Sequence, residues 1–168
     1  MTGLVLVSSI MKNPNIDVLG ANVQYIDESG KRSQVIKWPQ RDLLIKWCLC
    51  FMNPIAHPSV VIRRKPLTDI GGYDEEIAFA QDYNLWVKLS PRAHFGNHED
   101  TLVYLRKTRE NISFTKYNEQ KTFSHMISKH AINNIAGATV TQTVIDCILD
   151  ERIEGECTSK DFQKGLKT

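Results

Sequence analysis

The chain has 168 residues, of which 42% are hydrophobic and 24% are charged, and its formal net charge is +2. This length suits one domain that can bury a sizeable core, and the composition is that of an ordinary globular protein. The near-neutral charge excludes binding to nucleic acid, or to an anionic membrane, that net charge alone would drive. We therefore expect no nucleic-acid partner.

Cysteine usage and the N-terminus bear on the cellular compartment. No two of the four cysteines have C-x-x-C spacing, so we expect reduced thiols in a reducing compartment. They are Cys48, Cys50, Cys147 and Cys157. Residues 1–11 are apolar but lack the basic segment of a signal peptide, and the apolar run 43–52 is too short to span a bilayer. The sequence predicts a cytoplasmic protein.

The first part of the chain predicts a helix and a β-hairpin. Residues 4–11 read as a helix that ends at Asn-Pro 13–14. Residues 16–26 and 33–38 are rich in β-branched and aromatic side chains and flank a turn cluster at 27–30. Two such segments around a short polar turn predict an antiparallel hairpin.

Residues 42–52 predict a helix that buries a broad face, because apolar side chains recur at i, i+4 and i+8. These side chains are Leu43, Leu44, Trp47, Cys48 and Phe51. Residues 57–63 predict the next strand, whose apolar run at 60–62 suits a strand covered on both faces. A short helical turn at 65–70 then ends at the Gly-Gly pair 71–72.

The second half of the chain is richer in helix. Residues 80–89 predict a helix, and residues 94–106 contain a strand. Residues 117–136 and 140–151 then read as two amphipathic helices that are split at Gly137. One hypothesis for the chain is therefore a helix-rich interaction module, whose apolar faces would be covered by a partner.

Asp82 has two interpretations. If the helix at 80–89 runs through it, Leu85, Trp86 and Leu89 share its face at i+3, i+4 and i+7. A carboxylate on an apolar face is costly unless it is paired or its pKa rises, and a raised pKa suits a general base. In the alternative, Asp82 is the N-cap of the helix and accepts hydrogen bonds from its first backbone N–H groups.

Four short motifs follow one another between residues 53 and 89. They are His-Pro-Ser at 57–59, Arg-Arg at 63–64, Gly-Gly-Tyr-Asp at 71–74 and Gln-Asp-Tyr-Asn-Leu-Trp at 81–86. In this order they resemble the second half of a family 2 glycosyltransferase with the GT-A fold. In that family a His-x-Ser/Thr strand, a basic pair and a Gly-Gly-Tyr-Asp turn precede a helix that opens with an acidic dipeptide.

The resemblance implies roles for particular residues. Asp82 takes the position of the catalytic base, which deprotonates the acceptor hydroxyl as it attacks the sugar. Gln81 stands where the family commonly has Glu, and His57, Gln81, Trp86 and Tyr73 are implied to bind the acceptor. Other roles stay open for three of them: His57 as a strand residue, and Tyr73 and Trp86 as parts of the core.

A later segment extends the resemblance. Residues 102–106 and 111–113 are similar to a Tyr-Arg-x-His…Ser element of the family. The resemblance implies that Arg106 contacts a phosphate of the donor, although Thr108 stands where the family often has His.

The resemblance also implies the fold. We expect an α/β protein: a partial GT-A-like mixed sheet flanked by helices, with further helices at the C-terminus. The corresponding division is a partial glycosyltransferase domain at 1–116, a helical extension at 117–153 and a flexible tail at 154–168. A sheet cut short on one side exposes an edge or a face, so we expect a possible homo-oligomer.

The family's metal site has no counterpart in the sequence. An Asp-x-Asp motif would hold Mg²⁺ or Mn²⁺ against the nucleotide diphosphate, and none occurs in this chain. The resemblance also leads us to expect that the family's N-terminal nucleotide-sugar-binding half is missing from this sequence. We expect no metal ligands or cofactor in this chain itself, and Mg²⁺ or Mn²⁺ only when a donor-binding half is supplied.

Two further functions compete with the interaction module. The first is the acceptor-side part of an inverting glycosyltransferase, which transfers a sugar from a nucleotide-sugar donor to a glycan or other hydroxyl acceptor. It would use the nucleotide sugar only together with the missing half. The second is a truncated, non-catalytic remnant that acts as a glycan- or protein-binding module.

Overall fold

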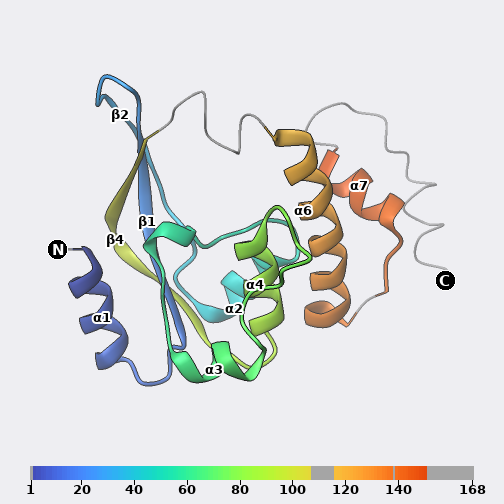
Figure 1. Cartoon of the computed structure of the whole chain (residues 1–168), viewed down its shortest axis with the longest axis horizontal. Helices are drawn as coiled ribbons and strands as arrows, with labels where there is room; N and C mark the ends of the chain where they lie inside the picture. Colours follow the sequence, from blue (N-terminus) through green and yellow to red (C-terminus); the bar gives the residue numbers. More distant parts are fainter. Residues whose placement is uncertain (1, 107–115, 138, 151–168) are drawn as a thin grey trace.

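The computed structural model describes residues 2–106, 116–137 and 139–150. Over these residues the chain is a mixed α/β protein, with a four-stranded mixed sheet flanked by helices (Figure 1), consistent with a partial GT-A-like fold. The predictions for Thr108, residues 111–113 and the tail at 154–168 lie outside the described residues.

Strand β1 (Val18–Ile26) is the centre of the sheet. Strand β4 (Phe95–Arg106) runs parallel to it along its whole length. Strand β2 (Arg32–Ile36) is antiparallel to the C-terminal part of β1, and β3 (Val61–Ile62) is antiparallel to its first two residues. The predicted hairpin is therefore confirmed as β1 and β2.

Buried polar side chains satisfy backbone groups in β1 and beside it, where neither β2 nor β3 pairs with β1. The Ala21 N–H donates to the Ser59 hydroxyl at 3.1 Å, from the 3₁₀ turn η1 (His57–Ser59). The Asn22 side chain accepts from the Trp38 N–H at 2.8 Å and donates to the Glu99 carbonyl at 2.6 Å. The Ser59 contact thus satisfies a backbone N–H of β1, whereas the Asn22 contacts satisfy backbone groups of Trp38 and Glu99 beside the strand.

The strand predicted at 57–63 is only partly correct. Its first half is the turn η1, because Pro58 has no N–H to give to a ladder. Only β3 remains as strand, and the apolar residues at 60–62 are half-buried. The run is nevertheless covered on both faces, because Val60 and Ile62 pack against the main core and Val61 packs against the cluster that contains α1.

Helices cover both faces of the sheet. Neighbouring residues of a strand point to opposite faces, so Val18 and Leu19 of β1 mark the two sides. Val18 lies in the main core with residues of α2 (Asp42–Leu49), α4 (Gln81–Leu89) and α6 (Tyr117–Ala131). Leu19 packs instead with Leu6 and Ile10 of α1 (Thr2–Lys12), which is the predicted N-terminal helix.

The buried face predicted for residues 42–52 is correct only in part: Phe51 packs against a second core cluster, and Cys48 is half-buried. Leu43, Leu44 and Trp47 are 75%, 48% and 60% exposed, whereas Ile45 and Leu49 are completely buried. The helix carries apolar residues on two stripes, and periodicity cannot tell which stripe meets the core. Tertiary packing against α4 and β4 decides it.

Two glycine-marked boundaries are confirmed. Helix α3 (Arg64–Asp69) is followed by Gly71 and Gly72, both with positive φ, and α4 comes after this turn. At the C-terminus, α6 continues into the π-helical turn η2 (Ile132–Ala136), and Gly137, also at positive φ, separates it from α7 (Gln142–Asp150). In the described ranges, no helix has both the length and the apolarity needed to cross a bilayer.

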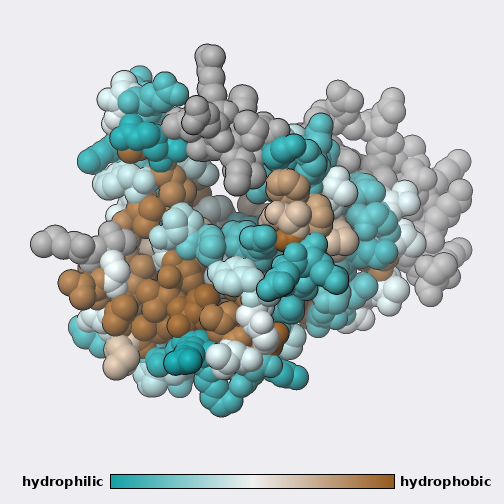
Figure 2. Space-filling view, in the orientation of Figure 1, coloured by the Kyte–Doolittle hydropathy of each residue, from teal (hydrophilic) through white to brown (hydrophobic). Residues whose placement is uncertain are grey.

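An apolar surface covers α1 and the neighbouring part of the sheet in Figure 2. Helix α1 contributes Leu4, Val5, Val7 and Met11, which are between 38% and 77% exposed. The predicted exposed face therefore exists, and association through it stays a prediction.

Gly20 of β1 lies against the Asn97 side chain, whose amide donates to the carbonyls of Pro39 and Pro54 at 2.8 and 3.1 Å. A methyl group at Gly20 would collide with the Asn97 side-chain oxygen, which these hydrogen bonds hold in place. We expect Gly20→Ala to lower the free energy of unfolding by about 1–3 kcal/mol in urea denaturation.

The matched control is Gly3→Ala in α1, where an added methyl group meets no atom within 4 Å. It should leave stability unchanged or slightly raised, since alanine favours a helix. Equal effects of the two substitutions would contradict the tight packing at Gly20.

Candidate active site

Asp82 is held by Asn53 at the start of α4. The Asn53 amide donates to Asp82 Oδ2 at 2.7 Å, and Asn53 Oδ1 accepts from the Ile55 N–H at 3.2 Å. The N-cap of α4 is Ala80, and no side chain caps this helix end, so the N-cap interpretation of Asp82 is wrong. Asp82 is half-buried and its carboxylate is oriented by an amide that is itself fixed.

The backbone turn before Asp82 is unusual. Ala80 has φ 56° and ψ 34°, the left-handed conformation that a residue with a Cβ rarely adopts. Such a residue costs about 1–3 kcal/mol and persists where the surrounding structure enforces it, often at functional sites. Ala80 and Asp82 both line the same cavity, so the strained turn presents the carboxylate to that space.

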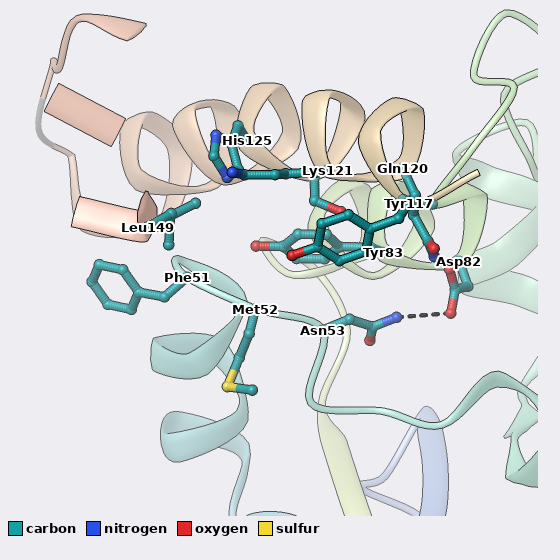
Figure 3. Close-up of a pocket in the computed structure, with 12 residues that line it drawn as sticks. Phe51, Met52, Asn53, Asp82, Tyr83, Tyr117, Gln120, Lys121, His125 and Leu149 are labelled. Atoms are coloured by element: carbon teal, nitrogen blue, oxygen red, sulfur yellow. Dashed lines mark hydrogen bonds between the residues drawn. The ribbon is translucent and has the colours of Figure 1, made fainter. Parts of the chain in front are cut away.

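The cavity has a volume of about 340 Å³, within the range of small-molecule sites. Residues of α4, α6 and α7, and of the connection that follows α2, line it. Figure 3 shows Asp82 and Asn53 at one end and Phe51 and Leu149 at the other, with Tyr83 between them. One end is thus polar and acidic and the other is apolar.

His57, Tyr73 and Trp86 form a second group near Asp82. His57 Nε2 and the Tyr73 hydroxyl are 2.7 Å apart. The His57 and Trp86 rings are arranged edge to face, with their centroids 6.2 Å apart. Burial, and to a lesser extent the Asp82 charge, raises the pKa of Tyr73, which keeps its phenol protonated. The structure therefore brings three of the predicted acceptor residues and Asp82 into one neighbourhood.

The exposure of these residues differs. Trp86 is completely buried, as the core alternative expects, and in the described part of the chain its indole N–H has no hydrogen-bond partner. Tyr73 is 43% exposed, and Gln81, the first residue of α4, is exposed beside Asp82. Tyr73 and Gln81 are exposed enough to contact a ligand directly, while the buried Trp86 ring packs against His57.

Arg106 is not brought to Asp82. Its guanidinium donates to the carbonyls of Asp27 and Glu28 at 2.8 and 3.2 Å, at the tip of the hairpin. Asn97, nine residues earlier on β4, is the residue that contacts the Pro54 carbonyl beside Asn53. Nine strand residues span about 30 Å. The donor-phosphate contact of Arg106 stays a prediction.

Sequence reasoning missed one wall of the cavity. Helix α6 lines it with residues at i, i+3, i+4, i+7 and i+8: Tyr117, Gln120, Lys121, Ser124 and His125. Residues at this spacing lie on one face of a helix, and the sequence pattern could have indicated this polar face. What no sequence pattern gave was the partner of that face, which is the start of α4.

The described residues offer no metal centre. Among residues 2–106, 116–137 and 139–150 there is no group of three or more His, Cys, Asp or Glu side chains that could hold an ion. The Mg²⁺ or Mn²⁺ that the resemblance attaches to a donor-binding half therefore has no ligand set among these residues.

Tyr83 ties α4 to the end of α2. Its hydroxyl donates to the Leu49 carbonyl at 2.7 Å, in the last turn of α2, where backbone carbonyls have no helical partner. We expect Tyr83→Phe to cost about 1–3 kcal/mol of stability at pH 8, because it leaves that buried carbonyl unsatisfied.

The Tyr83 contribution should depend on pH. Burial raises the pKa of Tyr83 well above its ordinary value, so the phenol ionises first in the unfolded chain. The stabilisation is complete below the unfolded pKa of about 10 and is lost as pH rises toward the folded pKa. Thermal melts should show a gap between wild type and Tyr83→Phe that narrows from pH 8 to 10.5. A gap that widens would contradict this.

The sequence of this chain is similar to parts of several known glycosyltransferases. The chain is 32% identical over 127 residues to the bifunctional glycosyltransferase pgtA of Dictyostelium discoideum, covering 72% of this chain and 16% of that protein. It is 28% identical over 101 residues to the UDP-Gal:alpha-D-GlcNAc-diphosphoundecaprenol beta-1,3-galactosyltransferase of Escherichia coli, covering 59% and 36%. It is 29% identical over 101 residues to the amylovoran biosynthesis glycosyltransferase AmsE of Erwinia amylovora, covering 60% and 37%.

These similarities support a relationship between this chain and glycosyltransferases. No family model matches the chain. The chain spans between 16% and 37% of the length of the three relatives described, so their activities as whole proteins come to this chain only as proposals.

Proposed function

We propose that this chain is the acceptor-side part of an inverting, family 2-like glycosyltransferase of the GT-A type. With a nucleotide-sugar-binding half, it transfers a sugar to a hydroxyl of a glycan or another acceptor. The observation that carries the proposal is the Asp82 carboxylate, fixed by Asn53 at 2.7 Å and facing a cavity of about 340 Å³. Similarity to several glycosyltransferases supports it.

Asp82 acts as the general base in this proposal. With Oδ2 engaged by Asn53, Oδ1 accepts the proton of the acceptor hydroxyl. The acceptor oxygen then attacks the anomeric carbon from the side opposite the leaving nucleotide diphosphate, which departs with the bonding electron pair. The proton ends on Asp82, and the new glycosidic bond has the inverted configuration.

His57 and Tyr73 bind the acceptor beside the base. Their 2.7 Å hydrogen bond fixes both groups, and the buried Trp86 ring limits the positions open to His57. Gln81 is exposed next to Asp82 and provides a neutral amide where the family commonly has a carboxylate. A neutral amide contributes no repulsion toward an acceptor that carries negative charge.

A glycan-binding module without catalysis is the second candidate. It is favoured by the sequence, which has no Asp-x-Asp motif to organise a metal against the leaving diphosphate. This candidate predicts acceptor binding at the cavity with no sugar transfer, even when a donor-binding half is supplied.

The stereochemistry of the product tests the proposal. We expect the completed protein to convert an α-linked nucleotide sugar into a β-linked product, read by NMR from the coupling constant of the anomeric proton. Retention of configuration would contradict a direct displacement assisted by Asp82. Acceptor binding with no product would favour the second candidate.

A further inference from the structure

Asn53 and Asp82 belong to different parts of the fold and meet through a hydrogen bond. Asn53 lies in the connection that follows α2, and Asp82 is the second residue of α4. The Asn53 amide donates to Asp82 Oδ2 at 2.7 Å, and Figure 3 shows the two side chains pointing toward each other. A hydrogen bond to a carboxylate is among the stronger ones in proteins, so it restricts rotation of the group and thereby the direction of the other oxygen.

The turn that carries Asn53 is itself fixed. Asn53 Oδ1 accepts from the Ile55 N–H at 3.2 Å, so the same side chain closes a turn over Pro54. Pro54 and Ile55 are both buried. The proline ring fixes its own φ and also restricts the residue before it. The Asn53 amide is therefore presented to Asp82 from a rigid position.

Asn97 of β4 ties this turn to the sheet. Its side chain is 5% exposed, and its amide donates to the Pro54 carbonyl at 3.1 Å and to the Pro39 carbonyl at 2.8 Å. Pro39 precedes α2 and Pro54 follows it, so one buried amide holds both ends of the α2 segment. Hydrogen bonds and one short turn thus connect the sheet to Asp82.

Stability alone gives an incomplete account of Asn97. Its Oδ1 is buried and has no hydrogen-bond partner in the described part of the chain, and a methyl group on Gly20 would collide with it. A buried polar atom without a partner costs free energy and calls for an explanation. Holding the turn at Pro54 in one place relative to the sheet supplies one.

We infer that Asn53 is the positioning residue of the Asp82 base and that Asn97 holds Asn53 in place. The Asn53 amide engages Oδ2, which directs Oδ1 toward the acceptor hydroxyl. The kinetic part of this inference rests on the proposed function, whereas the contact can be tested in this chain alone. Such positioning matters for rate, because a misplacement of about 1 Å can cost about 10²-fold.

Exchanging the two side chains tests the contact without any transfer reaction. In the double variant Asn53→Asp/Asp82→Asn, the amide at position 82 can donate to the carboxylate at position 53, whose other oxygen still accepts from the Ile55 N–H. Asn53→Asp alone brings two carboxylates together, which repel each other. We expect the urea midpoint to fall in Asn53→Asp and to recover most of the way in the exchanged variant. No recovery would overturn the inference.

Kinetics in the completed protein test the positioning role. Asn53→Ala should lower kcat about ten- to a hundredfold, with a far smaller change in the KM for acceptor. Asn97→Leu, or Asn97→Ser where the larger side chain prevents folding, should lower kcat in the same direction. In the Asp82→Asn background, Asn53→Ala should cause no further loss, because the group that it directs is gone. An equal loss in both backgrounds would mean that Asn53 acts independently of Asp82, and would overturn the inference.

Asn22 of β1 provides the matched control. It is a buried asparagine whose side chain also makes two hydrogen bonds, with the Trp38 N–H at 2.8 Å and the Glu99 carbonyl at 2.6 Å. It does not line the cavity. Asn22→Ala should therefore lower the urea midpoint and leave kcat of the folded protein unchanged. A loss of kcat as large as that of Asn53→Ala would reduce the effect to lost stability and contradict a positioning role.

Asp82→Asn separates this inference from the proposed function. If Asp82→Asn lowers kcat while Asn53→Ala keeps the wild-type value, the inference fails and the assignment of the base stands. If Asp82→Asn keeps the wild-type kcat, the proposed function fails, and the positioning of a base fails with it. A large loss in Asp82→Asn, a smaller one in Asn53→Ala and none in Asn22→Ala is the pattern that supports both.

Discussion

Asp82→Asn should lower kcat for sugar transfer by about 10² to 10⁴ in the chain completed by a donor-binding half. This is the usual contribution of a general base. The amide keeps the size of the side chain, but it cannot accept the proton of the acceptor hydroxyl. Steady-state kinetics with varied acceptor would measure the change, and KM should move far less than kcat.

Asp74→Asn is the control for this substitution. Asp74 lies in the connection between α3 and α4, pairs with Lys88 at 3.5 Å and does not line the cavity. Removing its charge should leave kcat within about threefold of wild type, because exposed ion pairs contribute little. Similar losses in both variants would mean that Asp82 acts through general electrostatics or folding, and not as the base.

Trp86→Ala should be the most destabilising single substitution considered. The side chain projects from α4, is completely buried and belongs to the main core, which also contains residues of α2 and β4. Emptying a site of this size costs about 3–5 kcal/mol, because the transfer free energy is lost and a cavity remains. Urea denaturation would show the loss as a lower midpoint with an unchanged slope.

Trp47→Ala is the matched control, since it removes the same side chain from a 60% exposed position. Its ring is arranged edge to face with that of Phe51, with the centroids 5.3 Å apart. We therefore expect the free energy of unfolding to fall by about 1 kcal/mol at most. Trp86→Phe should fall between the two, because it also removes a buried N–H that has no partner in the described structure. A Trp47→Ala loss as large as that of Trp86→Ala would contradict the packing of α2.

Local sequence signals predicted most of the secondary structure. The hairpin follows from two β-rich segments around a polar turn, and glycines at 71, 72 and 137 mark boundaries because they take positive φ. These features depend on residues that are close together in the chain. The mixed α/β class also followed, through the resemblance carried by residues 57–86.

Features that depend on contacts between residues far apart in the chain could not be predicted from the sequence. The buried stripe of α2 is chosen by its neighbours, and sequence alone favoured Leu43 and Trp47 over Ile45. The contact between Asn53 and Asp82 joins residues 29 positions apart. The polar stripe of α6 was visible as a helical pattern, but its place opposite α4 comes from the packing of Ile127 in the core.

The start of α4 shows why the site was predicted only in part. A carboxylate at the beginning of a helix suggests an N-cap, and local rules favour that role. The left-handed Ala80 takes the cap position instead, and this frees the Asp82 side chain to reach Asn53 and the cavity. A departure from local preference thus coincides with the residue on which the proposed chemistry depends.

A crystal structure with the acceptor that supports transfer would test the central claim most directly. The account predicts an acceptor hydroxyl at about 2.6–3.2 Å from the Asp82 carboxylate, within hydrogen-bond reach of a general base. It also predicts that Asn53 keeps its contact with Oδ2. An acceptor bound outside this cavity, or with every hydroxyl out of reach of Asp82, would contradict it.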